Sequence, residues 1–119
     1  MGIEIKPLAA GLGAEITGVD PAGEVSDADI AAIRAAWLEH LVLVFRNAPM
    51  THAQHIAFSR RFGELDTHDA IPKFRDPEYH EILPVTNQVI DGRKQPVGRQ
   101  WHSDLSTTLR PAMASMLRC

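Results

Sequence analysis

The chain has 119 residues, of which 45% are hydrophobic, a length and composition typical of one globular domain and not of an intrinsically disordered protein. Its formal net charge of -3 gives no electrostatic reason to expect nucleic acid as a partner, which favours small molecules. A single cysteine excludes an internal disulfide, and no stretch has the length of a signal peptide core or of a membrane span, so we expect a cytoplasmic protein that does not bind a membrane.

The chain opens with a pattern that predicts two strands and a helix. Residues 3–8 alternate between apolar and polar, and residues 14–19 follow two glycines, so each range predicts a short strand in a hairpin or at a sheet edge. Residues 27–40 carry apolar side chains at helical spacing, and Ser26 can cap their N-terminus. We therefore expect a helix over residues 27–40.

A continuous apolar run and a second capped segment follow. Residues 41–45 are all apolar and rich in β-forming types, which predicts a buried central strand. Thr51 and Gln54 have the spacing of a capping box, so residues 52–62 are expected to form a second helix. The helix dipole is enough to explain Arg61 at the end of that helix.

The second half of the chain has weaker patterns. Residues 66–81 and 87–98 are rich in turn-forming and charged types, which predicts two loops, and residues 82–86 between them are expected to form a strand. Residues 112–119 have the apolar content of a further strand but no closing turn. The chain is therefore expected to stop inside an unfinished sheet.

A histidine and an aspartate two positions apart form the main chemical motif. His102 and Asp104 lie in a stretch expected to be extended, where side chains at i and i+2 share one face and can meet one metal ion. One imidazole and one carboxylate with open positions are part of the ligand set of non-haem Fe(II) oxygenases. The alternative is an exposed strand end at which the two side chains hydrogen-bond to each other or to water. Trp101, on the opposite face, is expected to pack in the core.

Four segments in order and at similar spacing resemble the N-terminal part of the taurine/2,4-D dioxygenase family, whose members depend on Fe(II) and 2-oxoglutarate. The segments are Gly-Ala-Glu-Ile-Thr-Gly-Val-Asp at 13–20, Leu-Val-Phe-Arg at 43–46, Arg-Phe-Gly-Glu-Leu at 61–65 and Trp-His-Ser-Asp at 101–104. The resemblance implies an α+β fold in which residues 1–119 form the N-terminal part of one catalytic domain, truncated inside a double-stranded β-helix (jelly roll) with flanking helices.

The same resemblance implies the chemistry. His102 and Asp104 would bind Fe(II), 2-oxoglutarate would be the co-substrate, and O2 would be the oxidant, so that a small, anionic organic substrate is hydroxylated with release of succinate and CO2. The third metal ligand and the residues that bind 2-oxoglutarate are expected beyond Cys119. The 119-residue chain alone is therefore expected to be inactive.

Three further residues are implied to contact the substrate. His68 matches the position at which the taurine branch of the family places a histidine on the substrate sulfonate, with a solvated loop histidine as the alternative. Asn87 is expected to face the same pocket, with a purely backbone role at a strand end as the alternative, and Leu105 is expected to line it, with a core position as the alternative. The taurine branch has an asparagine where this chain has Gly98, so the substrate identity stays open.

A second hypothesis is a noncatalytic truncated protein. An unfinished sheet exposes unpaired backbone groups and apolar surface, which favours pairing with another copy or with a partner protein. A homo-oligomer is compatible with both hypotheses.

Overall fold

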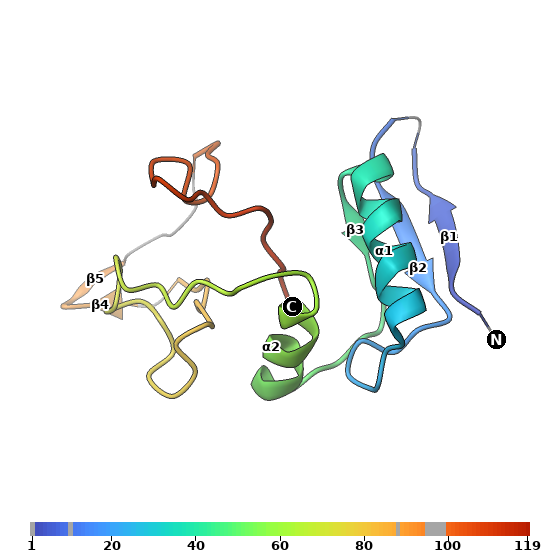
Figure 1. The fold of residues 1–119 in the computed structure, drawn as a ribbon. Coiled ribbons are helices and arrows are strands. Elements are labelled where there is room, and N and C mark those ends of the chain that lie inside the picture. Colours follow the sequence, from blue (N-terminus) through green and yellow to red (C-terminus); the bar gives the residue numbers. More distant parts are fainter. Residues whose placement is uncertain (1, 10, 88, 95–99) are drawn as a thin grey trace. The chain divides into compact units, whose positions relative to one another are not determined.

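A computed structural model of the chain describes residues 2–9, 11–87, 89–94 and 100–119. The chain divides into two compact units, Met1–Glu64 and Leu65–Cys119 (Figure 1). The elements run in the order β1, β2, α1, β3, α2, β4 and β5, which makes the fold α+β as expected.

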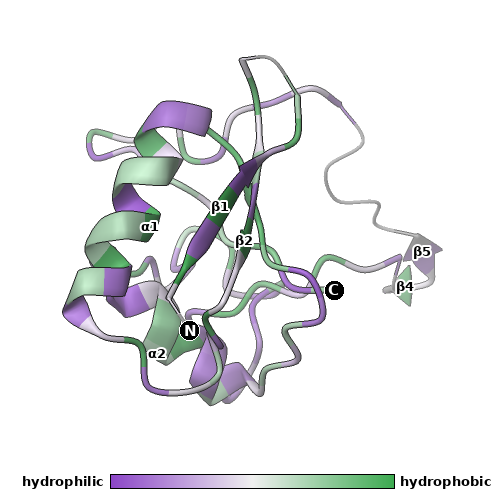
Figure 2. Cartoon of the chain, turned by 90° about the vertical axis from the view of Figure 1, so that its right-hand side faces the viewer, coloured by the Kyte–Doolittle hydropathy of each residue, from purple (hydrophilic) through white to green (hydrophobic). Residues whose placement is uncertain are grey.

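The first unit contains a three-stranded sheet in the order β1-β2-β3. Strands β1 (Glu4–Pro7) and β2 (Ala14–Thr17) pair antiparallel, which confirms the predicted hairpin. Gly18 turns the chain after β2 with a φ of +78°, a conformation that suits a residue without Cβ. Figure 2 shows that β1 is largely hydrophilic, in agreement with the exposure of all four of its residues.

Helix α1 spans Asp27–His40, as predicted, and connects β2 to the parallel strand β3 (Leu43–Val44). The Ser26 side chain accepts a hydrogen bond from the Asp29 amide and so caps the helix. A parallel pair needs such a crossover because its two strands run in the same direction.

The prediction of a buried central strand over residues 41–45 is wrong. Strand β3 has only two residues, both half-buried, and it lies at the sheet edge next to the central strand β2. Leu41 ends α1 with a φ of 67° and is 61% exposed, so the apolar run begins as a helix cap and not as a strand. The buried strand positions are Ala14 and Ile16 in β2.

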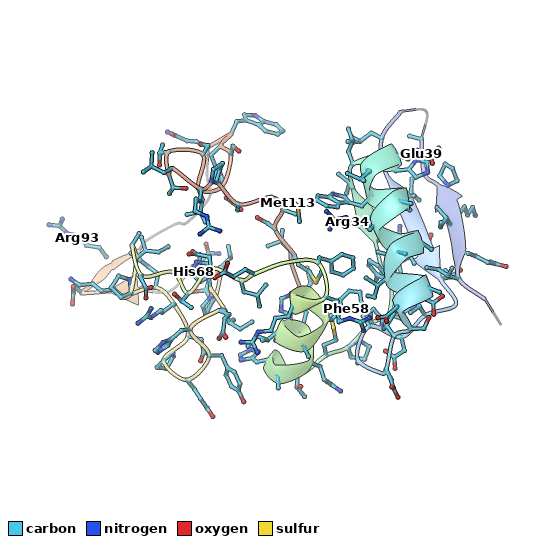
Figure 3. The ribbon with its side chains drawn as sticks, viewed as in Figure 1. Arg34, Glu39, Phe58, His68, Arg93 and Met113 are labelled. Atoms are coloured by element: carbon cyan, nitrogen blue, oxygen red, sulfur yellow. The ribbon has the colours of Figure 1, made fainter. Side chains whose placement is uncertain are left out.

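Helix α2 spans His52–Arg60, two residues shorter than predicted, and the capping box between Thr51 and Gln54 is present. Phe58, which Figure 3 labels on α2, packs edge-to-face against Phe45 and Phe62 with ring centroids 5.8 and 5.3 Å apart. The core consists of apolar side chains from β2, both helices and the β2–α1 loop: Ile16, Val25, Ile33, Ala36 and Phe58.

Arg61 does more than complement the dipole of α2. Its guanidinium donates one hydrogen bond to the Val25 carbonyl at 2.7 Å and another to the Asp27 carboxylate at 2.5 Å. The helix dipole is therefore an incomplete explanation of Arg61, because this side chain also links the end of α2 to the start of α1.

The described part of the second unit has little regular structure. Strands β4 (Val89–Ile90) and β5 (Arg93–Lys94) pair antiparallel across Asp91 and Gly92, both with positive φ, within a range expected to be a loop. Residues 66–81 form the predicted loop. The strands predicted over 82–86 and 112–119 are absent, since neither range joins a ladder with described residues. The jelly roll itself stays a prediction.

Candidate metal centre

The structure brings His102 and Asp104 together at the start of a turn and not along a strand. His102 Nε2 lies 3.1 Å from Asp104 Oδ1, and both side chains are about half exposed. Residues 101–103 belong to no strand, and a turn begins at Asp104, so the pair does not lie on a strand as expected. The two side chains nevertheless meet across the short span of two residues.

The other nitrogen of His102 has a partner as well. Nδ1 lies 2.7 Å from the carbonyl oxygen of Gln100, which can accept a hydrogen bond only from a protonated nitrogen. This bond and the neighbouring Asp104 carboxylate raise the pKa of His102, since both favour the charged imidazolium. A metal ion bound at Nε2 would take the place of a proton on that nitrogen.

Ser115 holds the far side of the carboxylate. Its hydroxyl donates a hydrogen bond of 2.5 Å to Asp104 Oδ2, while Oδ1 faces His102. Both oxygens of Asp104 thus have a protein partner. Sequence reasoning missed Ser115, because it lies eleven positions after Asp104 and no local pattern connects the two residues.

A shallow cavity of about 330 Å³ adjoins these three side chains. Its lining comes from the motif and from one later segment: His102, Ser103, Asp104, Ala112, Met113, Ala114 and Ser115. The cavity is open enough for a small molecule to approach the histidine and the carboxylate.

The donor set fits two positions of a metal site. An imidazole whose Nδ1 is held by a carbonyl presents Nε2 as a ligand once its proton is lost, and the carboxylate beside it is a suitable second ligand. Among the residues that the structure describes, no group of three His, Cys, Asp or Glu side chains gathers around one point. A third ligand is thus not visible in this part of the chain.

His68, labelled in Figure 3, lies in a loop that is stabilised by contacts among its own residues. Its Nδ1 is 3.2 Å from Asp66 Oδ2, its φ is 54°, and its side chain is 19% exposed. Arg75 reinforces the loop by donating to the Thr67 carbonyl at 2.7 Å and to Asp69 at 2.5 Å. His68 is therefore oriented by its own loop and is absent from the described lining of the cavity.

The structure does not bring the other two predicted substrate residues to the cavity. Asn87 is exposed at the end of an irregular stretch, and Leu105 is half-buried with a φ of 51°. Neither belongs to the described cavity lining. Gly98 lies outside the described residues.

The core position predicted for Trp101 is wrong. Its side chain is fully exposed, at 105% of the reference area, and it therefore packs against none of the described residues. The expectation failed because the strand that was to place it on a covered sheet face does not form in this part of the chain.

Comparison with known proteins identifies the relatives of this chain. Residues 4–119 match the family model described as taurine catabolism dioxygenase TauD, TfdA family. A curated relative from Delftia acidovorans, (S)-phenoxypropionate/alpha-ketoglutarate-dioxygenase, is 32% identical over 94% of this chain. The chain spans 39% of the length of that relative.

Two solved structures resemble the fold. A taurine dioxygenase from Burkholderia xenovorans is 33% identical with a TM-score of 0.61, over 92% of this chain and 37% of that protein. The structure of AAD-2 in complex with Mn(II) and N-oxalylglycine is 27% identical with a TM-score of 0.53, over 56% of this chain and 27% of that protein. Within the described residues, no helix has both the length and the apolar character needed to cross a membrane.

Proposed function

Since this chain belongs to the taurine catabolism dioxygenase TauD, TfdA family, we propose that it forms the N-terminal part of the catalytic domain of an Fe(II)- and 2-oxoglutarate-dependent dioxygenase. The domain is a jelly roll with flanking helices, and this chain ends inside it. The enzyme works in the cytoplasm, and the 119 residues alone do not turn over substrate.

The pairing of His102 with Asp104 is the single observation that carries this proposal. The two side chains approach to 3.1 Å, and the Gln100 carbonyl fixes the imidazole so that Nε2 is the nitrogen next to the carboxylate. His102 and Asp104 would therefore hold Fe(II) as two of its ligands. With iron, 2-oxoglutarate and O2 bound, the centre would supply the oxidising power that hydroxylates the substrate with release of succinate and CO2.

The substrate is proposed to be a small organic anion. The name of the Delftia acidovorans relative specifies phenoxypropionate, a carboxylate. His68 is the proposed anion-binding group, because an imidazole can carry a positive charge and Asp66, 3.2 Å from its Nδ1, holds the ring in one orientation. Asn87 and Leu105 are proposed to line the pocket once the whole domain is present.

Alanine substitution of the two ligands in the full-length enzyme tests the proposal. His102→Ala and Asp104→Ala should each abolish Fe(II)-dependent formation of succinate from 2-oxoglutarate, since each removes a ligand. His80→Ala is the matched control, because His80 is an exposed histidine of the same unit outside the cavity lining. Succinate formation at the wild-type rate in either ligand variant would refute the assignment of that ligand.

A noncatalytic, self-associating protein is the second candidate, and exposed apolar side chains favour it. Trp101 and Leu109 are fully exposed, and Leu117 is 81% exposed, all within the last nineteen residues described. Large apolar side chains in water favour association. Size-exclusion chromatography with light scattering separates the cases: a monodisperse dimer of the 119-residue chain supports the second candidate, and a polydisperse or insoluble product supports the dioxygenase fragment.

A further inference from the structure

The Ser115 hydroxyl donates a hydrogen bond to the Asp104 carboxylate, on the oxygen that does not face His102. We infer that Ser115 is a positioning residue for the metal centre, which selects the carboxylate oxygen that Asp104 offers to the metal. The inference rests on the proposed function, because it concerns the same metal centre.

The two carboxylate oxygens of Asp104 have different partners. Oδ2 accepts the Ser115 hydroxyl at 2.5 Å, and Oδ1 lies 3.1 Å from His102 Nε2. An O–H donor to a carboxylate at such a distance makes a charge-assisted hydrogen bond, which is stronger than a neutral one. Because Ser115 occupies Oδ2, the oxygen beside the histidine is Oδ1, and this oxygen would be the ligand.

Exposure explains why Asp104 needs such a partner. Its side chain is 53% exposed, so without Ser115 water would compete for Oδ2 and the carboxylate could rotate about its terminal bond. Hydrogen bonds to a ligating carboxylate fix its orientation, and losing such a partner commonly weakens metal binding about 10- to 100-fold.

The hydrogen bond between Ser115 and Asp104 also connects two segments that line the cavity. These segments are residues 112–115 and the motif residues 102–104. One hydroxyl therefore orients a ligand and holds the segment that bounds the adjacent space.

The test compares Ser115→Thr with Ser115→Val in the full-length enzyme. Threonine and valine have nearly the same shape, but only threonine keeps the hydroxyl. Mn(II) alone is the probe, and the loss of the free-ion electron paramagnetic resonance signal measures its dissociation constant. Ser106→Ala is the control, since the Ser106 hydroxyl donates to the Ser103 carbonyl, at 3.4 Å, and Ser106 is not among the described residues that line the cavity.

We expect Ser115→Val to weaken Mn(II) binding by about 10-fold or more, and Ser115→Thr and Ser106→Ala to bind as the wild type does. Equal Mn(II) affinity for the valine and threonine variants would overturn the role of Ser115 and leave the dioxygenase proposal intact. If the wild type and Asp104→Ala bound Mn(II) equally weakly, the metal centre itself would be refuted, and the role of Ser115 with it.

Discussion

Replacing Arg61 should show which of its two hydrogen bonds stabilises the first unit. Its guanidinium donates to the Val25 carbonyl at 2.7 Å and to Asp27 at 2.5 Å. The Asp27 side chain is fully exposed, whereas the Val25 residue is 5% exposed. The carbonyl therefore depends on Arg61 more than the carboxylate does, because water can replace the arginine at the carboxylate.

The expected loss of unfolding free energy follows from the different exposure of the two acceptors. A hydrogen bond from a charged donor contributes about 1.5–3 kcal/mol, and the 35% exposure of the Arg61 side chain places this one at the lower end. Arg61→Ala should therefore lower the free energy of unfolding by about 1.5–2 kcal/mol. Asp27→Asn should cause no resolvable loss, because solvent screens an ion pair at a fully exposed carboxylate.

Urea denaturation followed by circular dichroism at 222 nm measures both variants. Both described helices, α1 and α2, belong to the first unit, so this signal reports its unfolding. With an m value of about 1–1.5 kcal/mol/M, the Arg61→Ala midpoint should fall by about 1–2 M urea. A loss in Asp27→Asn as large as that in Arg61→Ala would refute the assignment of the stabilisation to the carbonyl bond.

Three further predictions concern single residues. Gly18→Ala should destabilise the first unit by more than ~1 kcal/mol in the same urea assay, because Gly18 has positive φ and a Cβ there would lie 2.3 Å from the Gly2 carbonyl oxygen. Thr51→Ala should cost about 1 kcal/mol through loss of the α2 cap, whereas Thr51→Ser should cost little. The Thr67 hydroxyl, and then Arg75, lower the pKa of Asp69, so the loop stability that this carboxylate provides should be complete above pH 3.8 and should be lost as the pH falls through the lower pKa of the folded state. An NMR titration of Asp69 checks this, and Thr67→Val should move its pKa back toward 3.8.

Local sequence patterns predicted the elements whose stabilising contacts are themselves local. Helix α1 begins and ends where the Ser26 cap and the apolar spacing indicated, and α2 begins at the predicted Thr51 capping box. A helix cap involves residues within three or four positions of each other, so the sequence contains the whole interaction. The family could be recognised for a related reason, since the motif segments keep their order along the chain whether or not they touch.

Sheet position depended on contacts that the sequence does not contain. Residues 41–45 have the composition of a buried strand, yet β3 lies at the edge of the sheet. Strand β1 pairs with one side of β2 and β3 pairs with the other, so β2 is the central strand. Composition cannot distinguish an edge strand from a central one, since this depends on which strands pair.

The candidate metal centre likewise has one part that the sequence determines and one part that depends on the tertiary structure. The sequence by itself determined that an imidazole and a carboxylate stand two positions apart at His102 and Asp104, and that spacing was enough to bring them together even outside a strand. The tertiary structure decided what surrounds them: the hydroxyl of Ser115 on Asp104, and the separate loop that holds His68. The cause is distance along the chain, because a bond between residues eleven positions apart forms only when the backbone between them has folded.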